Sequence, residues 1–153
     1  MLKKEQYLDV IEKTTLTSVD LIIMKNNCIL MGLRKNNPAK NYYFTPGVRT
    51  YKNENQLEAI KRVGKSELGI DINPENVKLV GVYDHIYDNN FDNNNFGTHY
   101  VVTAYLHKIK NNIKIELDDQ HDEIKWINID NMINDNTVHQ YVKNYYKNLK
   151  KLI

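Results

Sequence analysis

The sequence predicts an α+β domain in which helices pack on a mixed β-sheet. Apolar residues recur at helical spacing near both ends of the chain and once near its middle. Between these segments lie runs rich in β-branched and aromatic residues, separated by Gly, Pro and Asn. A chain of 153 residues is long enough to bury one hydrophobic core, so we expect a single domain over residues 1–153.

The first third of the chain passes from a helix to strands. A short amphipathic helix is predicted over residues 4–13, followed by two β-rich runs, LTSVDLIIMK (16–25) and CILMGLRK (28–35). The pair Asn26–Asn27 between these runs favours a hairpin turn. A third extended run, NYYFTPG (41–47), ends at a Pro-Gly turn.

A second helix is predicted over residues 56–68, with Asn55 as its cap. Leu57, Ile60 and Val63 are expected on its core face. Gly64 lies inside this helix at a cost of about 1 kcal/mol relative to Ala, which indicates close packing at that position.

Four later runs are predicted strands: VKLVGVYDHIY (77–87), THYVVTAYLHKI (98–109), NIKIEL (112–117) and EIKWINI (123–129). A last helix is expected over residues 137–151, because apolar side chains recur on one face and lysines occupy the others. Strands and helices in this order complete the predicted mixed sheet with helices on it.

Composition excludes several classes of partner. Lys and Arg number 21 against 19 acidic residues, which argues against a nucleic-acid-binding stripe or a membrane-surface face. No stretch approaches the ~20 apolar residues of a membrane span, and the N-terminus lacks a signal-like apolar core. The one cysteine, Cys28, cannot form an internal disulfide, so we expect a reducing, cytoplasmic location.

Residues 47–70 contain a loop and helix that resemble the Nudix box. That motif reads Gly, five residues, Glu, seven residues, then Arg-Glu-apolar-any-Glu-Glu-any-Gly-apolar. The residues of this chain that fall in register are Glu54, Arg62, Glu67, Gly69 and Ile70. The motif's opening glycine and two of its acids are replaced, by Val48, Val63 and Ser66.

These departures are similar to those of the GDP-mannose mannosyl hydrolases, a divergent family of the Nudix superfamily. Matching segments continue in order from about Ser18 to His139: SVDLI, GLRKNNPAKNYYFTPGVR, KSELGI, GVYDHIYDNNF, THYVV, DDQHDEIKWI and NTVH. The resemblance implies a Nudix fold, with a mixed sheet between helices in an α/β/α sandwich. It also implies hydrolysis of GDP-mannose or a related GDP-hexose to GDP and free sugar, by water attack at the anomeric carbon with inversion.

The altered helix fits this chemistry. Ordinary Nudix enzymes use clustered helix carboxylates to hold metal ions that position and acidify a water attacking phosphorus. Without two of those acids, Glu67, the Gly47 carbonyl and the Gln120 side chain remain as oxygen donors for one Mg²⁺ or Mn²⁺ per active site. One such ion neutralises the diphosphate of a departing GDP.

Other site residues follow from the resemblance. It assigns His121, in the polar run DDQHDE, as the general base that takes a proton from water. It places Arg34 and Arg49 on the diphosphate, where guanidinium groups donate paired hydrogen bonds, and Tyr100 as a donor to the leaving phosphate. Solvated surface residues, or a core tyrosine, are the alternatives for these positions.

Asp20 interrupts an apolar strand, where a carboxylate is costly unless paired or functional. By resemblance, Asp20 and His85 contact the sugar or offset charge at its anomeric carbon. Arg62 is predicted to orient helix carboxylates rather than touch substrate. His139 matches the family without an assigned role beyond lining or packing. The relatives are homodimers, so a homodimer is expected.

Two other functions remain open from the sequence. A Nudix pyrophosphohydrolase would cleave the P–O–P bond of a nucleotide sugar, although the residues Val63 and Ser66 count against it. A catalytically silent Nudix domain would only bind a nucleotide, and the β-branched Val48 in place of glycine is its best support. The preferred sugar is not determined by the sequence.

Overall fold

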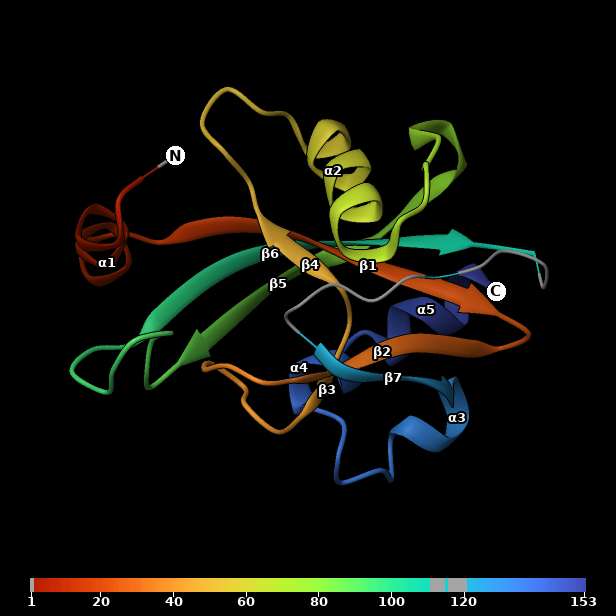
Figure 1. The fold of residues 1–153 in the computed structure, drawn as a ribbon. Helices are drawn as coiled ribbons and strands as arrows, with labels where there is room; N and C mark the ends of the chain where they lie inside the picture. The colour runs from red at the N-terminus through yellow and green to blue at the C-terminus, as the bar shows by residue number, and fades with distance from the viewer. Residues whose placement is uncertain (1, 111–114, 116–120) are drawn as a thin grey trace.

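The computed structural model describes residues 2–110, 115 and 121–153, without the side chains of residues 121 and 122. A mixed sheet forms the centre of this part of the chain (Figure 1). Its strands are β1 (Leu16–Lys25), β2 (Cys28–Arg34), β3 (Tyr43–Phe44), β4 (Gly47–Arg49), β5 (Val77–Tyr87), β6 (Thr98–Lys108) and β7 (His121–Asn128). The central order is β3-β2-β1-β6-β5, while β4 also pairs with β1 and β7 with β2. The pairing of β1 with β6 is parallel and the remaining pairs are antiparallel.

Helices cover both faces of the sheet. They are α1 (Lys4–Lys13), α2 (Gln56–Leu68), α3 (Ile129–Met132), α4 (Gln140–Lys143) and α5 (Tyr146–Leu152), with a 3₁₀ turn η1 (Pro74–Asn76) before β5. Helix α2 lies on one face and α3, α4 and α5 lie on the other, while α1 sits beyond one end of the sheet (Figure 1). The predicted α+β class and the sandwich of helices around a mixed sheet are therefore confirmed.

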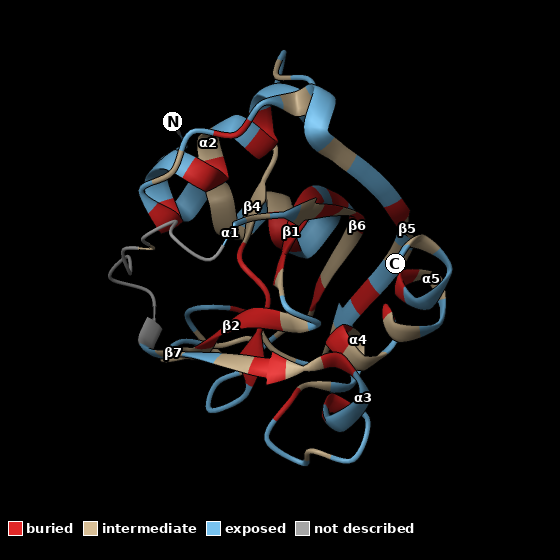
Figure 2. Ribbon diagram, turned by 90° about the vertical axis from the view of Figure 1, so that its right-hand side faces the viewer, coloured by how far each residue is buried: buried red, intermediate tan, exposed pale blue. Residues whose placement is uncertain are grey.

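Strand β1 is buried on both faces. Val19, Leu21 and Ile23 belong to the apolar cluster under α2, whereas Ile22 and Met24 belong to the cluster against the C-terminal helices. This division follows from the two-residue period of a strand. Figure 2 shows the result, with buried residues on β1 and β2 and exposed residues on the outward side of α2.

Along one edge, β1 changes partner. Its start pairs with β4, with Asp20 opposite Gly47, and its end pairs with β2 at Met24 and Lys25. The hairpin that joins β1 to β2 turns at Asn26–Asn27, both with positive φ, as their sequence predicted. The change of partner leaves Asp20 at the place where β4 replaces β2.

Helix α2 has the predicted bounds and cap. The Asn55 side chain accepts a hydrogen bond from the Glu58 backbone N–H, and the Glu58 side chain accepts one from the Asn55 backbone N–H. The two bonds form a capping box. Ile60 is fully buried as expected. The expectation for Leu57 is wrong, because it is 44% exposed: it lies in the first turn, before the buried part of the helix begins at Ala59.

The last predicted helix is divided in two. α4 begins after His139, whose Nδ1 accepts a hydrogen bond from the Tyr141 N–H, and α5 begins at Tyr146. Between them the Tyr145 N–H bonds to the Val142 carbonyl three residues back, so the α-helical pattern is interrupted. The predicted strand at 112–117 lies almost wholly outside the described residues. No helix among those described is long and apolar enough to cross a membrane.

The close packing predicted at Gly64 gives a test of the fold. An added Cβ would lie 2.5 Å from Ile72 Cδ1 and 3.2 Å from the Ile70 carbonyl oxygen. We expect Gly64→Ala to lower the free energy of unfolding by about 1 kcal/mol, because overpacking outweighs the gain in helix propensity. Denaturant unfolding measures this change, and the loss should shrink in an Ile72→Val background that lacks the Cδ1 atom. Lys61→Ala, on the exposed side of the same helix, is the control; a stabilising Gly64→Ala would contradict the packing.

Candidate active site

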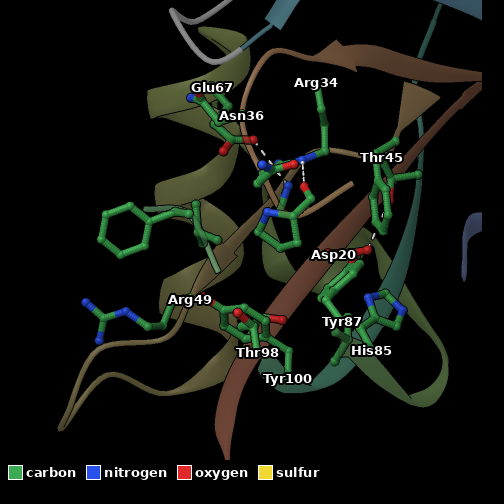
Figure 3. Close-up of a pocket in the computed structure, with 18 of the residues that line it drawn as sticks. Asp20, Arg34, Asn36, Thr45, Arg49, Glu67, His85, Tyr87, Thr98 and Tyr100 are labelled. Carbon is green, nitrogen blue, oxygen red and sulfur yellow. Dashed lines mark hydrogen bonds between the residues drawn. The ribbon is translucent and has the colours of Figure 1, made fainter. Parts of the chain in front are cut away.

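A pocket of about 700 Å³ opens beside the start of β1, within the range of sites for small ligands. Its walls come from α1, β1, the chain between β2 and β4, α2, β5 and β6. In the view of Figure 3, Glu67 and Asn36 are seen at the upper left, whereas Asp20, His85 and Tyr87 are seen at the lower right. Segments far apart in the sequence thus supply one cavity.

Most of the residues predicted for the site line this pocket: Asp20, Arg34, Gly47, Arg49, Arg62, Glu67, His85 and Tyr100. Of the other predicted site residues, Gln120 and the side chain of His121 lie outside the described residues. The backbone of His121 is described, and it pairs with Arg34 across β2 and β7. His121 therefore starts its strand beside a residue of the pocket wall.

Glu67 and Gly47 meet at the end of α2. The Glu67 side chain is 5% exposed, and its Oε2 accepts a hydrogen bond of 3.2 Å from the Gly47 N–H. No set of three His, Cys, Asp or Glu side chains suited to a metal occurs among the described residues. The hydrogen bond brings the Glu67 carboxylate to the Gly47 backbone, and a carboxylate suits a hard cation such as Mg²⁺, which commonly keeps several water or substrate oxygens as ligands.

The replaced acids of the box occupy different environments. Val63 is fully buried in the apolar cluster under α2. Ser66 is exposed and lines the pocket close to Glu67 in sequence. Neither side chain is charged, and Val63 packs in the hydrophobic core.

Arg62 differs from its prediction in one respect. Its guanidinium donates to both oxygens of Glu54, at 2.8 and 2.9 Å, and to the Arg49 carbonyl at 2.7 Å. Its main partner is therefore a loop acid rather than a helix carboxylate, since Glu58 is used in the capping box. The Arg62 guanidinium holds the pKa of Glu54 below its usual value. This pair ties the loop after β4 to α2.

The two pocket arginines are held differently. Arg34 Nε donates to the Pro38 carbonyl at 2.8 Å, which fixes the loop after β2 against its side chain. The Arg49 guanidinium lies over the rings of Tyr7, at 4.6 Å, and Tyr51, at 5.4 Å. Two cations on a shared cavity favour an anionic ligand.

Tyr100 meets helix α1 at the rim of the pocket. Its hydroxyl lies 2.7 Å from the Tyr7 hydroxyl. Burial, together with Tyr7, raises the pKa of Tyr100, so its hydroxyl stays protonated and able to donate at neutral pH.

Asp20 and His85 form the most buried polar part of the site. Asp20 is 6% exposed and His85 is 3% exposed. Asp20 Oδ2 accepts hydrogen bonds from the Tyr145 hydroxyl at 2.5 Å and the Thr45 hydroxyl at 3.1 Å. Burial raises the pKa of Asp20 to about 6 and lowers the pKa of His85 to about 4. Near neutral pH the pair is a carboxylate beside a neutral imidazole.

The other histidines have structural roles in the described part of the chain. His139 caps α4 and packs between the rings of Tyr42 and Tyr141. His99 and His107 lie on β6, as predicted, and His99 pairs with Asp84 at 2.9 Å.

The sequence interpretation missed several residues around the pocket. Tyr87 lies two positions after His85 on β5 and lines the same cavity, so the strand period alone could have identified it. Tyr7 also lines it, from α1. Thr45 and Tyr145 carry no local signal, because their bonds to Asp20 span 25 and 125 residues.

The opposite pKa shifts of Asp20 and His85 predict opposing effects of pH on stability. Unfolded His85 binds a proton below about pH 6.5 and folded His85 only below about pH 4, so this group lowers stability as pH falls between those values. Folded Asp20 binds its proton below about pH 6, but unfolded Asp20 only below about pH 3.8, so it raises stability as pH falls. Burial is the largest cause of both shifts. Tyr145, Thr45 and Arg34 oppose the rise in the pKa of Asp20. His139 adds to the fall in the pKa of His85, and Asp84 opposes it.

Single variants should separate the two effects. As the pH is lowered from 6 to 4, Asp20→Asn should lose stability by up to about 1.4 kcal/mol per pH unit. His85→Gln should gain stability over the same interval, and the native chain should show a weaker dependence than either. Urea unfolding with EDTA present measures the three slopes. Slopes of the same sign in both variants would contradict the assigned shifts.

Comparisons with known proteins identify the family of this chain. Residues 14–149 match the family model described as the NUDIX domain. The low-salt glycan biosynthesis protein Agl8 of Haloferax volcanii is 32% identical over 121 residues, covering 79% of this chain and 76% of that protein.

Solved structures show the same fold. A MutT NUDIX hydrolase from Burkholderia pseudomallei has a TM-score of 0.75 at 22% identity, covering 89% of this chain and 98% of that one. A MutT protein from Methanosarcina mazei Go1 has a TM-score of 0.74 at 16% identity, covering 92% and 96%. The family model spans most of the chain, and these folds agree with it. The chain therefore belongs to the Nudix hydrolase family.

Proposed function

We propose that this Nudix protein hydrolyses GDP-mannose or a related GDP-hexose to GDP and free sugar. The observation that carries the proposal is the division of one pocket into two chemical halves. Arg34, Arg49 and Glu67 suit a diphosphate with its metal, whereas Asp20 and His85 are buried polar residues of the same wall, with Asp20 against Gly47. A nucleotide sugar has both a diphosphate and a polar sugar ring.

The altered helix favours attack on carbon. Attack on phosphorus in this family relies on a cluster of helix carboxylates that assembles the nucleophile. Val63 is buried in the core and Ser66 carries no charge, so α2 offers Glu67 without those two acids. Attack on carbon needs instead a base outside the helix and a stabilised leaving group.

The chain's own residues would stabilise the departing GDP. Arg34 and Arg49 would donate to diphosphate oxygens, and the protonated Tyr100 would donate to the leaving phosphate. Mg²⁺ or Mn²⁺, one per site, would be held by Glu67, the Gly47 carbonyl and Gln120, and would neutralise diphosphate charge when bound.

At the sugar, His121 would take the proton from the attacking water. The pairing of its backbone with Arg34 supports this role, because it starts β7 beside the pocket wall. Asp20, ionised at neutral pH, would offset positive charge growing at the anomeric carbon, and His85 would lie beside the sugar ring. A single displacement by water inverts that carbon.

The comparisons support a sugar-bearing substrate. Agl8 is named for glycan biosynthesis, a process in which sugars are commonly carried as nucleotide derivatives. A homodimer, from the resemblance to the GDP-mannose mannosyl hydrolases, and a cytoplasmic location, from the single cysteine, are also part of the proposal.

The bond that breaks distinguishes this function from its rivals. Hydrolysis of GDP-mannose in ¹⁸O-labelled water should place the label on mannose and none on the GDP phosphates. The initial anomer, read by NMR before mutarotation, should be β from an α-linked substrate, because one displacement inverts the carbon. A parallel reaction with EDTA reports hydrolysis that does not need the metal.

Each other product would point elsewhere. GMP and mannose phosphate, with label on phosphate, would show a pyrophosphohydrolase and overturn the proposal. Binding without turnover on a panel of GDP-hexoses would show a silent nucleotide-binding domain. An initial α anomer would replace direct displacement with a two-step route.

Glu67 gives a test of the metal-binding end. Glu67→Gln should weaken Mg²⁺ binding and lower turnover by on the order of 10- to 100-fold, because it removes the buried charged ligand while keeping the shape. Glu58→Gln is the matched control on the same helix: Glu58 is exposed, and its amide replacement can still accept from the Asn55 N–H. Metal titrations and initial rates measure both variants. Equal losses at the two positions would place the metal elsewhere on α2.

A further inference from the structure

The Tyr145 side chain joins the two residues proposed to face the sugar. Its hydroxyl lies 2.5 Å from Asp20 Oδ2 and 3.3 Å from His85 Nε2. Tyr145 precedes α5, is fully buried and is not among the described residues that line the pocket. It therefore reaches both groups from behind the pocket wall.

The proton of this hydroxyl has one clear destination. Burial raises the pKa of Tyr145 well above its usual value, so the hydroxyl stays protonated. A tyrosine hydroxyl donates one hydrogen bond, and the shorter contact directs it to the Asp20 carboxylate. The longer contact to His85 is then one in which Nε2–H donates and the tyrosine oxygen accepts.

The donors to Asp20 also distinguish its two carboxylate oxygens, because both reach the same one. Tyr145 and Thr45 both donate to Oδ2. The other oxygen, Oδ1, faces Gly47, where a Cβ would lie only 2.2 Å away. Two donors on Oδ2 fix the carboxylate plane, and the absence of a Cβ at Gly47 lets Oδ1 lie against the Gly47 backbone.

We propose that Tyr145 is a positioning residue for the sugar end of the site: its hydroxyl fixes the Asp20 carboxylate and holds His85 as the Nε2–H tautomer. The kinetic part of this inference rests on the proposed hydrolysis of a GDP-hexose, whereas the tautomer does not. Such orienting partners typically change activity by about 10- to 100-fold when removed.

A packing role is the alternative, since Tyr145 also contacts the Tyr83 ring at 4.8 Å between centroids. Tyr145→Phe keeps the ring and removes only the hydroxyl. Tyr146→Phe is the matched control, because it removes the neighbouring hydroxyl. That hydroxyl donates a hydrogen bond of 2.7 Å to Asp130, and neither residue lines the pocket.

The first measurement is independent of any substrate. Imidazole ¹⁵N NMR near pH 7 should show His85 of the native protein as the Nε2–H tautomer, and Tyr145→Phe should shift it toward a mixture. Tyr146→Phe should leave the native signal unchanged. A native Nδ1–H tautomer, or a signal that Tyr145→Phe does not change, would overturn the proposal.

The second measurement is the turnover of GDP-mannose with Mg²⁺. Tyr145→Phe should lower kcat by about 10- to 100-fold with KM within about threefold, and should have little further effect on Asp20→Asn. Unchanged kcat, or full additivity with Asp20→Asn, would refute the positioning role. If the native chain turns over no GDP-hexose, the proposed function fails, and the tautomer measurement alone decides the inference on Tyr145.

Discussion

The burial of β1 on both faces is the constraint on which the rest of the structure depends. A strand of ten residues, nearly all buried, must have apolar partners on each side, and α2 and the C-terminal helices provide them. One edge of β1 pairs with β6 in parallel from Leu16 to Met24. The other edge of β1 is shared between β4 and β2. That sharing brings Asp20 and Gly47 together, and with them the two halves of the pocket.

A charge in such a strand needs compensation. An isolated carboxylate in a low-dielectric interior is costly, whereas one that accepts hydrogen bonds from fixed donors is tolerated. Asp20 has Tyr145 and Thr45, and the Arg62 guanidinium has Glu54. The hydrogen bonds that offset the cost of burying these charges also fix the directions of the two side chains in the pocket.

Helix α2 departs from the Nudix box at two acids while Arg62 and Glu67 stay in register. A capping box begins the helix, Gly69 ends it in the left-handed conformation, and Glu67 is buried. Val63 packs under the helix where the motif has an acid, which adds to the apolar cluster and removes a charge from the helix. Packing of the helix and the metal binding proposed for Glu67 therefore depend on different residues of neighbouring turns.

The sequence by itself determined most of the long helices and strands and identified several residues that line the pocket. Strand and helix periods gave the bounds of α1, α2, β1, β5 and nearly those of β6, and the motif register identified Glu67 and Arg62. These signals are local, because they depend on periods and spacings within one segment. Only the tertiary structure decided that Arg62 pairs with Glu54, that the last helix breaks before Tyr146, and that Tyr145 reaches Asp20. Such contacts depend on how elements far apart in the chain pack, and a hydroxyl that finds its acceptor 125 residues away leaves no pattern near itself.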